Sequence, residues 1–195
     1  MRYIVLFNMF KLFVFLAFTV ATCYGAQGQG VLCGPLPRRL TRCLNMAPAI
    51  SGEIQDKCHE SRTATECERL TCIFREYNLL DGTTVNKDRT NAFLDNYVKQ
   101  YPVWTTAVQH AKAACLGDVE LKPQGIDLNC PIYDTLQCIF SSLIKYATPS
   151  QWSTTSECQG YRAFAAACPI CPEDCFAAQV PIGSCNACLT LPRSA

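Results

Sequence analysis

The sequence has no excess of charge of either sign. Seventeen Lys and Arg residues stand against 16 Asp and Glu residues, which gives a formal net charge of +1. A nucleic-acid-binding chain is expected to be basic and a disordered chain to be highly charged. Here charged residues make up 17% of the chain and hydrophobic residues 49%. We therefore exclude nucleic acid as a partner and expect the 195 residues to form one folded domain with an extension.

The chain also lacks the motifs of common enzymatic chemistry. It contains no glycine-rich phosphate loop, no His-Glu-x-x-His pair and no nucleophile elbow. Its two histidines are His59 and His110, and the sequence offers neither of them a nucleophile and an orienting acid. We therefore predict that the protein is not an enzyme and holds no cofactor or metal. Either histidine stays a candidate pH trigger, because imidazole titrates near physiological pH.

A long apolar run occurs near the start of the chain, at residues 4–21. Arg2 and Lys11 supply positive charge beside it, and the small residue Gly25 follows. This layout is typical of a secretory signal peptide. We therefore predict a signal peptide at 1–25 and a secreted, extracellular mature protein.

A membrane anchor is the alternative for this run, but its uninterrupted part, Leu12–Ala21, is shorter than the about 20 residues that a spanning helix needs. No second run of that length follows, so no membrane anchor is expected. Cleavage after Gly25 or Ala26 removes Cys23 and leaves fourteen of the fifteen cysteines. An even number in a secreted chain predicts full pairing into disulfides.

Hydrophobic periodicity predicts a helical mature chain, and no alternating run of strand length competes with it. A less regular segment at 33–60 precedes the helices, and a tail rich in proline and cysteine follows at 169–195. The five predicted helices run from a capping box at Thr63-x-x-Glu66 to Tyr77, from near Asn86 to Tyr101, from Val103 to Cys115, from Pro131 to Ala147, and from a second capping box at Thr154-x-x-Glu157 to Cys168.

The tail has the spacing of a zinc ribbon. Cys168-x-x-Cys171 and Cys185-x-x-Cys188 are thirteen residues apart, and Cys175 is left over. Because a signal peptide directs the chain to an oxidising compartment, we favour disulfides at these positions over zinc.

From residue 67 onward, the two close cysteines of Cys67-Glu-Arg-Leu-Thr-Cys72 are followed by the turn at 79–82. Pro149-Ser-Gln-Trp152 and Cys168-Pro169 occur farther along the chain. This cysteine pattern resembles that of insect odorant-binding proteins, in particular the subgroup with additional cysteines. Two of the cysteine spacings, from Cys67 to Cys72 and from Cys158 to Cys168, are one residue longer than is usual for the family. The resemblance implies an all-helical domain at 26–168, with 169–195 as an extension packed on it.

The resemblance also implies an interlocked disulfide pattern, in which six core cysteines pair first with third, second with fifth and fourth with sixth. Carried over, this order predicts Cys43–Cys72, Cys67–Cys158 and Cys115–Cys168. Cys130 and Cys138 are rival partners for the last two pairs. The remaining cysteines expected in disulfides are Cys33, Cys58, Cys130, Cys138, Cys171, Cys175, Cys185 and Cys188.

The function implied by the resemblance is the transport of small hydrophobic molecules, such as odorants or pheromones, through sensillum lymph or another extracellular fluid. Besides the ligand, a chemosensory receptor and a second copy of the chain are candidate partners. The alternative is an extracellular interaction protein, such as a protease inhibitor that presents a loop of the tail. For a carrier, large apolar residues on the helical faces are the expected cavity lining: Phe74, Tyr77, Phe93, Leu94, Tyr97, Trp104, Val108, Ile139, Phe140, Leu143 and Ile144.

Overall fold

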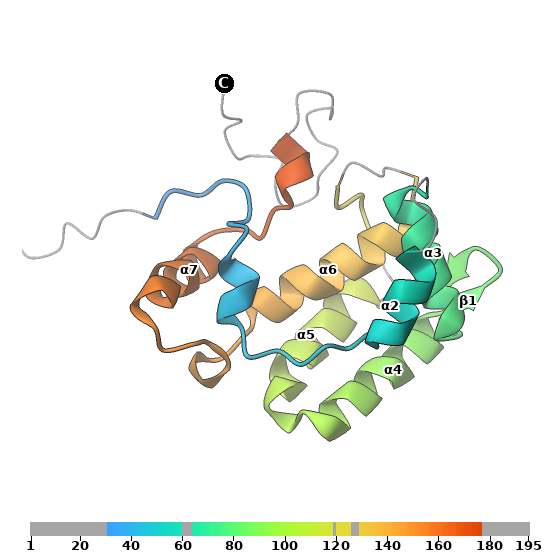
Figure 1. Ribbon diagram of the computed structural model, residues 1–195, viewed down its shortest axis with the longest axis horizontal. Helices are drawn as coiled ribbons and strands as arrows, with labels where there is room; N and C mark the ends of the chain where they lie inside the picture. The colour runs from blue at the N-terminus through green and yellow to red at the C-terminus, as the bar shows by residue number, and fades with distance from the viewer. Residues whose placement is uncertain (1–30, 60–63, 119, 126–128, 177–195) are drawn as a thin grey trace, which may run out of the picture. The chain divides into compact units, whose positions relative to one another are not determined.

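The computed structural model describes residues 31–59, 64–118, 120–125 and 129–176 of the chain (Figure 1). This part consists of α-helices, short 3-10 helices and one small hairpin, so the prediction of a disulfide-rich helical domain is confirmed. In chain order the elements are η1 (Leu40–Cys43), α2 (Gly52–His59), α3 (Glu66–Glu76), β1 (Leu80–Asp81), β2 (Thr84–Val85), α4 (Lys87–Gln100), η2 (Pro102–Trp104), α5 (Thr105–Cys115), α6 (Pro131–Lys145), η3 (Pro149–Gln151), α7 (Ser156–Ala167) and η4 (Glu173–Phe176). The predicted signal peptide lies outside the described residues.

All five predicted helices are present, as α3 to α7. Asn86 is the N-cap of α4, where its side-chain oxygen accepts a hydrogen bond of 2.8 Å from the backbone N–H of Arg89. Helix α6 begins at Pro131 as predicted, because proline at the first position loses no hydrogen bond that the helix needs.

Both predicted capping boxes are misplaced. The box of α3 is formed by Thr65 and Glu68, two residues later than predicted, with bonds of 3.2 Å from Glu68 N to Thr65 Oγ1 and 2.7 Å from Thr65 N to Glu68 Oε2. The N-cap of α7 is Thr155, and its side chain makes no capping bond. At the start of α3, Thr and Glu both recur two residues later, so the sequence spacing there fits two registers.

The sequence did not predict η1, α2 or the hairpin of β1 and β2. The segment 33–60, expected to be less regular, contains η1 and α2. Helix α2 is short, and Ser51 starts it by accepting a hydrogen bond of 3.4 Å from Ile54 N. Where only a turn was expected, β1 and β2 pair as a hairpin around Gly82, whose φ of 63° is easy only for glycine.

Helix α6 is central to the packing. It contacts α5, α3 and α7, and in Figure 1 it runs between α7 and α3. The sequence of α6 is apolar around most of its circumference, so it can be buried on several sides at once. One part of its surface joins a core built with α5 and α7, and the other joins a core built with α3.

Every cysteine in the described part of the chain is disulfide-bonded. Cys171 and Cys175 are bonded too, and Cys185 and Cys188 lie outside the described residues. The Cα–Cα distances of the five bonds between described residues are 5.3–6.0 Å, within the usual range. These bonds are Cys33–Cys168, Cys43–Cys158, Cys58–Cys72, Cys67–Cys130 and Cys115–Cys138.

The three pairings carried over from the resemblance, Cys43–Cys72, Cys67–Cys158 and Cys115–Cys168, are wrong. The rival partners are found instead, with Cys67 bonded to Cys130 and Cys115 to Cys138. The cause is the unpredicted helix α2, which places Cys58 on α3 next to Cys72. Cys43, in η1, packs on α7 and bonds to Cys158.

The interlocked order itself is present on a different set of cysteines. Three of the bonds pair first with third, second with fifth and fourth with sixth, and the other two bonds enclose them in the sequence. The six interlocked cysteines are Cys58, Cys67, Cys72, Cys115, Cys130 and Cys138.

Two sulfur atoms of the zinc-ribbon spacing are engaged in disulfides. Cys168 is bonded to Cys33, and Cys171 is also disulfide-bonded. A sulfur in a disulfide is no thiolate, so these two positions are not available to zinc. The start of the tail packs on the helices: Ile170 is buried in the core, and Leu36 N donates a hydrogen bond of 2.8 Å to Cys171 O.

Candidate apolar binding cavity

A cavity of about 240 Å³ lies between α3, α4, α6 and the segment that joins η1 to α2. Almost all of its wall is aliphatic or aromatic. The lining residues are Met46, Ala47, Pro48, Ala49, Ile50, Ile73, Phe74, Tyr77, Leu79, Thr90, Phe93, Leu94, Tyr97, Leu136, Ile139, Phe140 and Leu143.

The wall follows from helical periodicity. Helix α4 contributes residues 90, 93, 94 and 97, and α6 contributes 136, 139, 140 and 143. Both sets have the spacing i, i+3, i+4, i+7, which places four side chains on one face of a helix. Two such faces therefore meet across the cavity, and α3 contributes Ile73 and Phe74 between them.

Eight of the eleven predicted lining residues are on this wall: Phe74, Tyr77, Phe93, Leu94, Tyr97, Ile139, Phe140 and Leu143. The other three, Trp104, Val108 and Ile144, are not. They are at most 1% exposed and belong to the core around α5 and α6. The apolar face of α5 is used for packing on α6, so α5 contributes nothing to the cavity.

Sequence reasoning missed the segment 46–50 and the wall residues Ile73, Leu79, Thr90 and Leu136. Ile73 and Leu136 carry a usable signal, since each continues the helical spacing of a predicted neighbour. The segment 46–50 is apolar but has no period, so its sequence does not tell what it covers.

The hydroxyl groups on the wall are all engaged with the backbone. Tyr97 donates its phenolic hydrogen to Ala47 O at 3.1 Å, and Tyr77 accepts a hydrogen bond of 2.8 Å from Ser51 N. Thr90 donates to Asn86 O at 2.8 Å within its own helix. A ligand therefore meets a surface whose polar atoms already have partners.

The wall is also without formal charge at neutral pH. Apart from Tyr77 and Tyr97, no lining residue is ionisable. Burial raises the pKa of the Tyr97 phenol above its ordinary value of 10.0, and the neighbouring Tyr101 raises it further. The cavity can therefore hold an apolar molecule, but it offers no counter-charge to an ionised group.

Neither histidine lies on the cavity wall. His59 is exposed and its Nε2 is 3.2 Å from Arg69 Nη1, and His110 stacks on Tyr146 with the ring centroids 3.8 Å apart. The interpretation of either as a pH trigger stays a prediction.

Three other hollows have mixed polar and apolar walls. One, of about 370 Å³, includes Lys87, Glu120 and Asp134. Another, of about 380 Å³, is beside Lys145, and the third, of about 200 Å³, is beside Arg162. Their charged rims make them less suited to an apolar molecule than the cavity beside α3.

No family model matches the chain, and no curated protein is significantly similar to it. Within residues 31–59, 64–118, 120–125 and 129–176, no helix is long and apolar enough to cross a membrane. In the same ranges, no three His, Cys, Asp or Glu side chains come together as a metal site.

Proposed function

We propose that the protein is a secreted carrier of small hydrophobic molecules, of the kind that insect odorant-binding proteins represent, and that the cavity beside α3 is its binding site. The observation that carries this proposal is an uncharged, largely apolar hollow of about 240 Å³ in a small helical domain. A domain of this size ordinarily fills such a space with side chains. Disulfides supply stability that lets it stay open.

The order of the disulfides supports the same assignment. The interlocked pairing first–third, second–fifth and fourth–sixth is the one that the resemblance implies, although Cys58, Cys130 and Cys138 stand where other cysteines were expected. Five disulfides are also typical of a protein from an oxidising, extracellular compartment.

The volume of the cavity suggests the size of the ligand. An apolar cavity of about 150 Å³ binds benzene, so 240 Å³ accommodates about ten non-hydrogen atoms. Micromolar affinity corresponds to about −8 kcal/mol. Divided over ten atoms, this binding free energy is about 0.8 kcal/mol per atom, which is below the ceiling of about 1.5 kcal/mol per atom for very small ligands. Micromolar binding is tight enough to carry a molecule and loose enough to release it.

The test is binding of 1-aminonaphthalene, a neutral two-ring fluorophore, and its displacement by uncharged volatile compounds. Leu136→Trp fills the cavity from α6, and we expect it to weaken binding of the fluorophore at least tenfold. Val103→Trp is the matched control, because Val103 is 63% exposed and away from the wall, and we expect it to bind normally.

Circular dichroism shows whether both tryptophan variants keep their helices. Absence of saturable binding to the wild-type protein, or equal binding by both variants, would overturn the proposal. The interpretation as a surface-acting protein, such as a protease inhibitor, would then be preferred.

A further inference from the structure

One wall of the cavity is not a helix. Residues 46–50, here called the strap, run as a coil from η1 to α2, in blue-green in Figure 1, and all five of them line the cavity. Pro48 and Ala49 are also exposed to solvent. The cavity therefore approaches solvent at these two residues.

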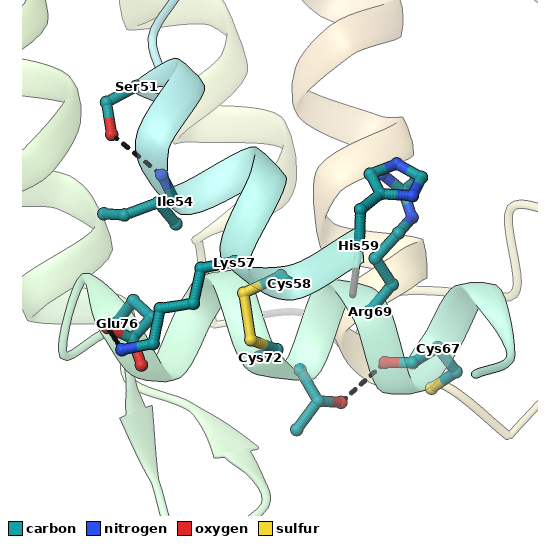
Figure 2. Close-up of a disulfide and its surroundings, with 10 residues drawn as sticks. Ser51, Ile54, Lys57, Cys58, His59, Cys67, Arg69, Cys72 and Glu76 are labelled. Carbon is teal, nitrogen blue, oxygen red and sulfur yellow. Dashed lines mark hydrogen bonds and ion pairs between the residues drawn. A yellow bond between two sulfur atoms is a disulfide. The ribbon is translucent and has the colours of Figure 1, made fainter. Parts of the chain in front are cut away.

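Both ends of the strap are fixed. Before it, Asn45 N donates to Gln151 O at 2.9 Å, and Cys43 is bonded to Cys158 of α7. After it, α2 is held on α3 by the disulfide Cys58–Cys72 and by an ion pair of 2.7 Å (Figure 2). The residues of this ion pair are Lys57 and Glu76.

The middle of the strap is held by little. Among the described residues, the only hydrogen bond made by residues 46–49 is the one that Ala47 O accepts from Tyr97. At the far end Ser51 N donates to Tyr77, and Gln55 Nε2 donates to Ile50 O at 3.1 Å. Two tyrosines of the cavity wall thus fasten the strap from inside.

The other walls are much harder to move. A disulfide links α3 to the N-cap of α6 through Cys67–Cys130. Helix α4 carries no disulfide, but it packs on α5, where Asp95 pairs with Lys112 at 2.7 Å, and α5 is bonded to α6 through Cys115–Cys138. Parting these helices would also expose the buried core around them. Moving the strap outward breaks few hydrogen bonds and leaves every disulfide intact, because its anchors are at its two ends.

We propose that the strap is the gate of the cavity and that Tyr97 and Tyr77 are its latches. The inference rests on the proposed binding function. The strap bows outward between its disulfide-anchored ends, a ligand passes, and the two hydroxyl contacts re-form behind it. A gate of this kind governs how fast a ligand exchanges and has little effect on how tightly it is held.

The kinetic test uses 1-aminonaphthalene and stopped-flow fluorescence on Tyr97→Phe and Tyr77→Phe. Loss of one latch should raise the association and dissociation rate constants together, by about threefold to tenfold, the effect of one net hydrogen bond. The dissociation constant should change less than twofold. Tyr101→Phe is the matched control, since its ring packs on Tyr97 at 5.0 Å but its hydroxyl makes no hydrogen bond among the described residues.

Amide hydrogen exchange of the ligand-free protein tests the latch without any ligand. The amide of Ser51, which donates to Tyr77 at the end of the strap, should exchange faster in Tyr97→Phe than in Tyr101→Phe, while those of α4 and α6 stay unchanged. If the fluorophore fails to bind the wild-type protein, the binding function fails and this measurement still decides the latch. Unchanged exchange of the Ser51 amide in Tyr97→Phe, or a rise in dissociation alone with weakened affinity, would overturn the gate.

Discussion

Two isoleucines of α6 offer a matched test of whether the cavity is real. Ile132 is 3% exposed and packs in the core with α3, whereas Ile139 is 7% exposed and lies on the cavity wall. They share a residue type and a helix and differ in what their side chains face. We expect Ile132→Ala to destabilise the protein about twice as much as Ile139→Ala.

The magnitude follows from what each truncation removes. Both delete three carbons, whose transfer from water contributes about 2.4 kcal/mol at about 0.8 kcal/mol per group. At Ile132 the truncation also opens a new void in packed surroundings, which brings the total to about 4 kcal/mol. At Ile139 a hollow already exists, so the void adds little and about 2.4 kcal/mol is expected.

The assay is denaturant unfolding of both variants, followed by circular dichroism with the disulfides intact. It is paired with displacement of 1-aminonaphthalene by uncharged competitors of increasing size. Ile139→Ala should shift the preference toward larger competitors, and Ile132→Ala should leave the preference unchanged. Equal loss of stability in the two variants, with no change in preference, would mean that both faces are solid core.

Three further predictions concern disulfides, pH and a helix end. Reductant should lower the melting temperature of the helical circular dichroism signal steeply, since each disulfide contributes about 2–4 kcal/mol to stability. Non-reducing peptide mapping should recover Cys67 linked to Cys130. A melting temperature that does not change with reductant would contradict the fold. Burial raises the pKa of Tyr97 in the folded state, so its contribution to stability is complete below pH 10.0 and is lost as the pH rises through the raised pKa. The free energy of unfolding should therefore fall less with rising alkaline pH in Tyr97→Phe than in the wild-type protein. Lys145→Met should destabilise the protein by about 1–3 kcal/mol. The reason is that Nζ of Lys145 donates hydrogen bonds of 2.8–3.0 Å to three carbonyl oxygens at the end of α7. An unchanged denaturation midpoint would show that water replaces these bonds.

Helices α3 to α7 could be predicted from the sequence because helix formation leaves a local signature. Apolar residues recur every three or four positions, and Pro131 and Asn86 mark helix starts by chemistry that needs no tertiary partner. Helix α2 has only eight residues and few apolar positions, so its own periodicity is too weak to predict it. Packing on α3 through the bond between Cys58 and Cys72 supports it instead.

The disulfide pairing was decided by tertiary structure. The cysteine content and the signal-peptide pattern predicted that the cysteines pair, and this depends only on composition and compartment. Which sulfur atoms meet depends on helices brought together from distant parts of the chain. Cys67 and Cys130 are 63 residues apart in sequence, yet their Cα atoms are 6.0 Å apart.

The cavity, too, could be predicted only in part from the sequence. The sequence determined which face of each helix is apolar, and so eight of its wall residues could be named. It could not separate Ile139 from Ile144 or reveal that α5 faces only core, because an apolar stripe looks the same whether it meets a neighbour or a hollow. That difference is set by the spacing of α3, α4 and α6 and by the course of the strap, which the disulfides at both its ends hold in place.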